Sequence, residues 1–159
     1  KKQVEINKEA LDMHDVINDA ISHVSLLSND KKGTITTDFE AIQSEILVNQ
    51  FHMTNVLVNM LENALKYSDN RPKIDVFTQN TNKNLIIKII DEGIGISKNA
   101  QKQIFNKFYR EQKGNIHDVK GHGLGLAYVK EILDSHHGTV FVESEKGKGS
   151  TFTIKLPLI

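Results

Sequence analysis

The sequence has no cysteine, and this absence excludes a disulfide framework, thiolate metal sites and a cysteine nucleophile. It also lacks long apolar runs: the stretch from Leu85 to Ile90 contains a lysine and is far too short to span a bilayer. Net charge is absent as well, because 20 basic residues balance 20 acidic ones. We therefore expect no overall field that attracts nucleic acid, and no direct contact of this domain with a membrane.

What is present is the composition of an ordinary globular domain. The chain has 159 residues, of which 38% are hydrophobic and 25% charged, enough for one core. We expect residues 1–159 to form a single domain. No signal-peptide pattern opens the chain, and its abrupt start at Lys1-Lys2-Gln3 suggests a piece of a longer protein.

Periodicity predicts helices interspersed with mostly antiparallel strands. Helices are expected at residues 13–27, 51–67, 98–108 and 124–135. Strands are expected at residues 33–39, 45–48, 74–78, 85–90, 139–144 and 151–156, after a short extended piece at 4–6. This order favours an α/β two-layer sandwich, in which one mixed, largely antiparallel sheet carries helices packed on one face.

The helix expected at residues 51–67 carries an unusual polar stripe. At 100° per residue, the stripe contains three asparagines, and the rest of the circumference is apolar; its members are His52, Asn55, Asn59, Glu62, Asn63 and Lys66. The asparagine side chain competes for backbone hydrogen bonds inside a helix, so three asparagines on one helix face are unusual and need an explanation. One interpretation is a solvated face. The other is a neutral wall of amide oxygens facing a phosphate–metal ligand, since magnesium takes oxygen ligands and keeps several waters.

Three glycine clusters follow this helix. Residues 91–96, Asp-Glu-Gly-Ile-Gly-Ile, come directly after a buried strand, where a carboxylate can accept a hydrogen bond from the exocyclic amine of a base. Residues 121–126, Gly-His-Gly-Leu-Gly-Leu, open a helix whose backbone N–H groups can approach phosphates. Residues 147–151 link the last two strands, either as a plain hairpin turn or as a further part of the site. Neither the Rossmann nor the Walker glycine spacing is present.

Together, these segments resemble the motifs of sensor histidine kinases. Residues 59–67 look like the N box, 91–96 the G1 box, 104–110 the F box and 121–126 the G2 box, and 147–152 resemble the final glycine motif. The resemblance covers nearly the whole chain in the family's order. It implies the Bergerat ATP-binding fold, shared with gyrase-type, mismatch-repair and heat-shock-chaperone ATPases. It also implies ATP and Mg²⁺ as ligands.

The resemblance implies a role for each matching residue. Asn63 would coordinate magnesium, with Asn59 on the same wall, and Lys66 would reach the phosphates. Tyr67 would border the adenine and Asp91 would accept from its amino group. The remaining expected nucleotide-binding residues are Gly93, Gly95 and Ile96 near the base, Gly121, His122, Gly123, Leu124, Gly125 and Leu126 at the phosphates, and Thr151 at the adenine end. Arg110 would act as a catalytic residue with Asn59, by approaching the terminal phosphate.

Residues 111–122 match the ATP lid of the family, with Phe105 and Phe108 either anchoring its base or simply packing in the core. Residue His122 faces either phosphate or solvent. None of the seven histidines is expected to accept the phosphate: the pair His14-Asp15 lacks the family's continuation, and His23 is assigned to the surface. The pair His136-His137 is expected to end a helix.

The family implies partners outside this sequence. The phosphoacceptor would be a dimerisation hairpin that precedes the domain, with residues 1–10 as a remnant of the linker, and a response regulator would act downstream. The isolated domain is expected to be a monomer, the parent a homodimer. By family expectation this is a cytoplasmic domain, and the parent is anchored in the bacterial inner membrane.

Three activities are compatible with the fold that the resemblance implies. The first is phosphoryl transfer to a protein histidine. The second is a nucleotide-binding module that regulates without kinase activity, and the third is a serine kinase or ATPase of the same fold. The hydrolysing relatives place a glutamate four residues before the magnesium asparagine, where this chain has Asn59, which cannot act as a general base. This difference favours the kinase.

Overall fold

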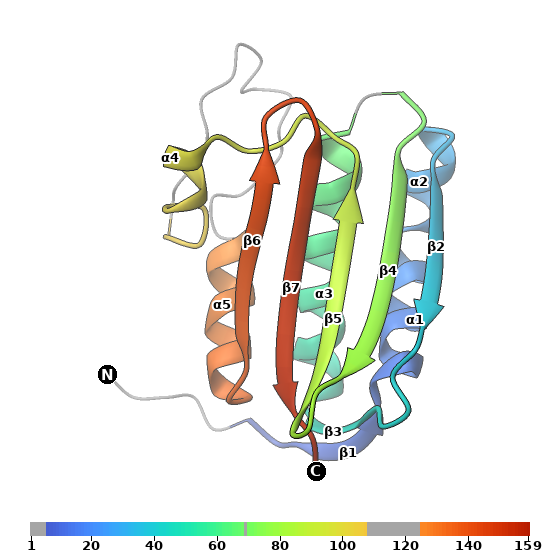
Figure 1. Ribbon diagram of the computed structural model, residues 1–159. Coiled ribbons are helices and arrows are strands. Elements are labelled where there is room, and N and C mark those ends of the chain that lie inside the picture. Colours follow the sequence, from blue (N-terminus) through green and yellow to red (C-terminus); the bar gives the residue numbers. More distant parts are fainter. Residues whose placement is uncertain (1–5, 69, 108–124) are drawn as a thin grey trace.

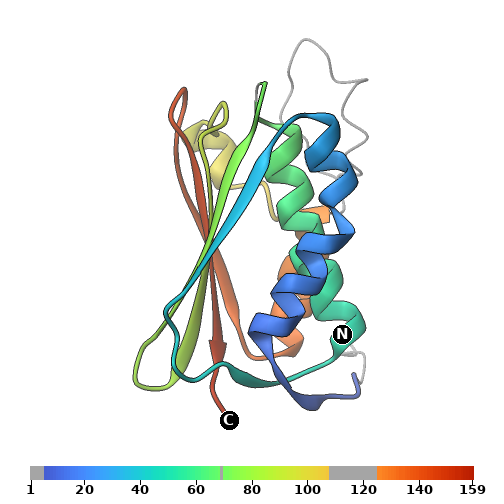
Figure 2. The ribbon, with the colours of Figure 1, turned by 90° about the vertical axis from the view of Figure 1, so that its right-hand side faces the viewer.

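A computed structural model describes residues 6–68, 70–107 and 125–159. Figures 1 and 2 show two layers, a sheet and a layer of helices on one of its faces, and the sheet has five strands. The sheet has the order β2-β4-β5-β7-β6, in which only β2 and β4 are parallel neighbours. The strands are β2 (Thr34–Phe39), β4 (Lys73–Asn80), β5 (Asn84–Asp91), β6 (Thr139–Glu145) and β7 (Gly149–Pro157). This architecture confirms the predicted α/β sandwich.

The helices are α1 (Met13–His23), α2 (Ser25–Asp30), α3 (Gln50–Lys66), α4 (Lys98–Gln101) and α5 (Gly125–Ser135). Helix α3 packs against both α1 and α5, so it lies in the middle of its layer (Figure 1). A separate two-stranded sheet, β1 (Glu9–Asp12) with β3 (Glu45–Val48), lies below these helices. No helix within the described ranges is long and apolar enough to cross a membrane.

The core lies between the sheet and α3. Alternate residues of β5 and β7 point to the helices, and Ile87, Ile89 and Ile154 are almost completely buried there. From α3, buried Met53, Leu57 and others meet them. Both central strands, β5 and β7, are hydrogen-bonded to a neighbour on each side, and this pairing fixes which residues lie together at their ends.

Helix α3 has well-defined ends. The side chain of Asn49 accepts a hydrogen bond from the His52 N–H at 2.9 Å and so caps the first turn. At the other end, the ammonium of Lys31 donates to the carbonyl of Leu65 at 2.6 Å. A cation among the last carbonyls of a helix also complements the helix dipole.

Some predicted boundaries need correction. The helix predicted at residues 13–27 is two helices, because the chain turns at Val24, whose N–H is shared between the carbonyls of Ala20 and Ile21. The helix predicted from residue 98 ends at Gln101 as α4, with turns after it, and residue 108 lies outside the described residues. The extended piece was expected at residues 4–6, of which 4 and 5 are outside the description. The observed strand is Glu9–Asp12, which pairs with β3.

Candidate functional site

The carboxyl group of Asp91 lies at the end of β5 and is only 8% exposed. It accepts a hydrogen bond from the N–H of Gly93 at 2.8 Å and a second from the backbone of Ser150. Burial raises the pKa of Asp91, and the two backbone hydrogen bonds offset part of that effect. A carboxylate has about four lone-pair sites, so these bonds leave capacity for a donor on a ligand.

The loop after Asp91 packs against the end of α3. The N–H of Ile94 donates to the carbonyl of Tyr67 at 3.1 Å, and a Cβ on Gly93 would lie 2.6 Å from that carbonyl oxygen. The Asp91 carboxyl group and the last turn of α3 are therefore brought side by side. The close approach to Tyr67 is one reason for glycine at position 93 that does not depend on a ligand.

The same loop is bonded to the β6–β7 hairpin. The N–H of Ile96 donates to the hydroxyl of Ser144 at 2.7 Å, and Gly147 N–H donates to the carbonyl of Ile94 at 2.7 Å. Gly95 has a φ of 75°, and a Cβ there would be 2.2 Å from the Glu145 carbonyl oxygen. The third glycine cluster is thus a hairpin turn, and it supports the loop that follows Asp91.

Thr151 does not lie with Asp91. In the strand register, Asp91 is opposite Ser150, whereas Thr151 is opposite Ile90. Side chains alternate along a strand, so Thr151 is on the face of the sheet away from the helices. Ser150, which is 6% exposed and hydrogen-bonded to Ser144 at 2.7 Å, occupies the position beside Asp91. Sequence reasoning missed this residue, although the alternation in β7 was the signal that identifies it.

The second half of the polar stripe lies at the Asp91 end of α3. Asn59, Asn63 and Lys66 are half-buried along it. A Cβ on Gly125, the first residue of α5, would lie 3.8 Å from the amide oxygen of Asn59. The first turn of α5 therefore adjoins this half of the stripe. Tyr67 caps the helix and is 39% exposed.

The first half of the stripe also faces α5. Nδ1 of His52 is hydrogen-bonded to the Tyr128 hydroxyl at 2.8 Å, and the Asn55 side chain is hydrogen-bonded to the same hydroxyl. Burial raises the pKa of Tyr128, and the bond from Asn55 offsets part of this. Asn55 thus has a partner on a neighbouring helix, which neither interpretation of the stripe included.

Several predicted residues lie outside the described ranges: Arg110, Gly121, His122, Gly123, Leu124, Phe108 and the lid at 111–122. Among the described ones, Leu126 is half-buried in the first turn of α5, and Phe105 packs edge to face on Phe152 at a centroid distance of 6.3 Å. This contact is the packing role considered for Phe105.

The histidines that are described have structural partners. His136 is buried at the end of α5, where its Nδ1 donates to the Ile132 carbonyl at 2.7 Å and its Nε2 accepts from the Asn49 N–H at 3.0 Å. His137 follows in a left-handed conformation with φ 60°, as expected at a helix end. His14 stacks on Phe39 and is hydrogen-bonded to the hydroxyl of Thr78 at 2.8 Å.

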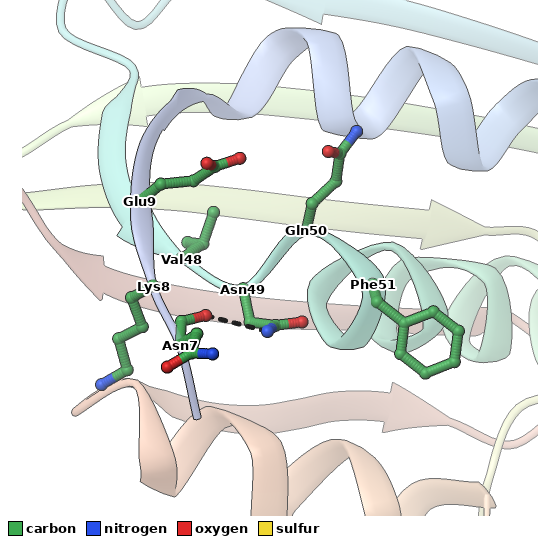
Figure 3. A pocket seen from close by; sticks show the side chains of 7 residues that line it. All are labelled: Asn7, Lys8, Glu9, Val48, Asn49, Gln50 and Phe51. Atoms are coloured by element: carbon green, nitrogen blue, oxygen red, sulfur yellow. Dashed lines mark hydrogen bonds between the residues drawn. The ribbon is translucent and has the colours of Figure 1, made fainter. Parts of the chain in front are cut away.

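A hollow of about 460 Å³ lies at the other end of α3 (Figure 3). Its lining comes from the chain before and at the start of β1, and from the end of β3 and the start of α3, and includes Lys8, Val48, Asn49 and Phe51. With a rise of 1.5 Å per residue, Asn49 lies about 20 Å along α3 from Asn63. The hollow is therefore separate from the site beside Asp91.

A cation at the Asp91 end would depend on amide oxygens. In the described part of the chain, no three His, Cys, Asp or Glu side chains are grouped to hold a metal. The amides of Asn59 and Asn63 are neutral oxygen donors on one face of α3. This donor set fits a magnesium ion that receives its other ligands from phosphates and water.

The comparisons with known proteins identify the family. Residues 48–159 match the model described as "Histidine kinase-, DNA gyrase B-, and HSP90-like ATPase". The chain belongs to this family, and within it to the ATP-binding catalytic domains of sensor histidine kinases, which act in two-component signal transduction.

Similar curated proteins are sensor kinases. Sensor protein RprX of Bacteroides fragilis is 42% identical over 163 residues, which cover 100% of this chain and 31% of that protein. Sensor protein kinase WalK of Staphylococcus aureus is 35% identical over 158 residues, covering 96% of this chain and 37% of that protein. The chain spans about a third of the length of these relatives.

Solved structures share the fold. The catalytic domain of histidine kinase ThkA superimposes with a TM-score of 0.79 at 19% identity, covering 96% of this chain and 99% of that one. Full-length ShkA in complex with AMPPNP gives a TM-score of 0.84 at 21% identity, covering 99% of this chain and 32% of that one. These likenesses confirm the Bergerat architecture.

Proposed function

We propose that this domain binds Mg²⁺–ATP at the Asp91 end of β5, beside the last turns of α3 and the first turn of α5, and that its parent protein transfers the terminal phosphate to a histidine on a helical hairpin. The observation that carries the proposal is the meeting of three features: a buried acceptor at Asp91, the amides of Asn59 and Asn63, and the first turn of α5 beside Asn59. Each feature suits one part of the nucleotide, in the order base, metal and phosphates.

Asp91 selects the base. Its carboxylate accepts an N–H from the adenine amino group, while Gly93 and Ser150 hold it in place. A hydrogen bond to a charged group contributes about 1.5–3 kcal/mol, so this contact should account for a substantial part of the binding free energy. Guanine presents a carbonyl oxygen at this position, and a carboxylate repels it. Tyr67, half-exposed at the end of α3, borders the base.

The phosphates belong at α5. Its first N–H groups have no partner within the helix and carry the positive end of the dipole. Asn63 would supply an amide oxygen to a magnesium ion, whose charge would offset that of the phosphates. Lys66 adds a positive charge on the same stripe, and the family resemblance assigns Arg110 to the terminal phosphate.

The residue at position 59 favours phosphoryl transfer over hydrolysis. Asn59 stands beside α5, and an amide cannot take a proton from water. The nucleophile is then the acceptor histidine, and the domain contributes position and electrostatics. The acceptor hairpin, a response regulator and a homodimeric, membrane-anchored parent are parts of the same proposal; in the solved structures, ThkA is in complex with response regulator protein TrrA.

Radiolabelled ATP tests this function in the complete parent protein. The expected product is a phosphoprotein that is labile to acid and stable to alkali, and Asn63→Leu in the parent abolishes it. A label that survives acid would indicate a serine kinase. Release of phosphate without labelling would indicate an ATPase, and binding with neither reaction would indicate a regulatory module.

A further inference from the structure

We propose that Tyr128 is a positioning residue for phosphate binding, which acts by holding the first turn of α5 against α3. The inference rests on the proposed function, because the phosphates are assigned to α5. Its basis is the clasp formed by Tyr128 with His52 and Asn55, a contact that joins the two helices through one hydroxyl group.

The clasp lies on the same stripe of α3 as the predicted metal ligand. Asn55 and Asn59 are four residues apart, and His52 is three residues before Asn55, so all three lie on one face of the helix. The His52 and Tyr128 rings are also neighbours, tilted at 47° with centroids 6.1 Å apart. The contact with His52 therefore fixes the position of Tyr128 relative to α3, the helix that carries Asn59 and Asn63.

On α5, Tyr128 is close to the phosphate-binding end. It follows Gly125 by three residues, which is a rise of about 4.5 Å, or less than one turn. Gly125 itself would place a Cβ 3.8 Å from the Asn59 amide oxygen. A helix is stiff over one turn, so a bond that fixes Tyr128 also fixes the N–H groups at Gly125 and Leu126.

Partial burial explains why a single hydroxyl group can hold α5 against α3. A phenol can donate one hydrogen bond and accept others, so Tyr128 satisfies both partners at once. All three side chains are half-buried between the helices, where the exchange with water is restricted. Removal of the hydroxyl leaves two polar groups without their partner, and α5 loses its polar contact with the middle of α3.

The test compares a ligand that has phosphates with one that has none. For Tyr128→Phe, the Kd of a non-hydrolysable ATP analogue with Mg²⁺ is expected to rise about three- to tenfold, the range of one neutral hydrogen bond. The Kd of adenosine is expected to change less than about twofold, because Asp91 is untouched. A loss of fold alone would weaken both ligands together.

Lys130→Gly is the matched control. Lys130 is exposed on α5, and its ion pair among the described residues is with Asp134 at 3.3 Å; glycine there weakens the helix by about 1 kcal/mol without touching α3. The control is expected to keep the ratio of the two Kd values. An unchanged ratio in Tyr128→Phe, or the same shift in Lys130→Gly, overturns the inference while the proposed function stands. Wild-type protein that binds neither ligand overturns both.

Discussion

Replacement of His136 by phenylalanine should destabilise the domain through the contact between α5 and α3. The imidazole is 2% exposed and bridges the Ile132 carbonyl and the Asn49 N–H. Phenylalanine fills the space but offers no acceptor to Asn49. An N–H left without a partner in a buried place costs about 1–3 kcal/mol, and we expect about 2 kcal/mol.

For a domain of this size, about 2 kcal/mol lowers the Tm by about 4–8 °C. Thermal unfolding followed by circular dichroism at pH 7.5 measures it. His137→Asn is the control, because residue 137 is exposed in a left-handed conformation that asparagine tolerates. It should change the Tm little.

The pH dependence gives a second criterion. Burial lowers the pKa of His136, so below about pH 6.5 the unfolded chain takes up a proton that the folded domain resists. This contribution to wild-type stability is present at neutral pH and lost as the pH falls. The gap in Tm between wild type and His136→Phe should therefore narrow on acidification. An equal Tm at pH 7.5, or a gap that widens in acid, would refute the reasoning.

Three other predictions concern the site and its supports. Gly149→Ala should unfold the hairpin or lower the free energy of unfolding by several kcal/mol, because a Cβ there would be 2.1 Å from the Asp91 carbonyl oxygen. Gly147 also has a positive φ, but a Cβ there would have nothing within 4 Å, so Gly147→Ala should lower the free energy of unfolding by only about 1–2 kcal/mol in denaturant titrations. Affinity for an ATP analogue should fall in acid at a pH above the ordinary aspartate range, since burial raises the pKa of Asp91 and the ionised form is the better acceptor; a pH-independent affinity in Asp91→Asn is the companion result. Lys31→Met should lower the free energy of unfolding by about 1 kcal/mol, because it removes the ammonium that caps α3; no change would mean that water replaces it.

The sequence predicted those elements whose signals are local. The apolar face of α3, the alternation in β7 and the turn at Gly147 each lie within one segment, and the structure has all three. β1 was missed because a four-residue strand depends on its partner β3, more than thirty residues away, and carries little signal of its own.

The site was predictable in outline but not in its detailed contacts. The position of Asp91 after a buried strand indicated a buried acceptor, and the structure has one. The assignment of Thr151 to the site came from the family resemblance. The strand register decides which side chain lies beside Asp91, and that residue is Ser150. The division of the polar stripe depends on Tyr128 of α5, a residue that α3's own periodicity cannot reveal.

Calorimetric titration of this domain with a non-hydrolysable ATP analogue, with and without Mg²⁺, is the most direct test of the central claim. Wild type should bind in both conditions and more tightly with Mg²⁺, Asn63→Leu should lose the gain from Mg²⁺, and Asp91→Ala should lose about tenfold or more in both. A folded wild-type domain that binds no nucleotide, or an Asn63→Leu variant that keeps the full gain from Mg²⁺, would contradict the account.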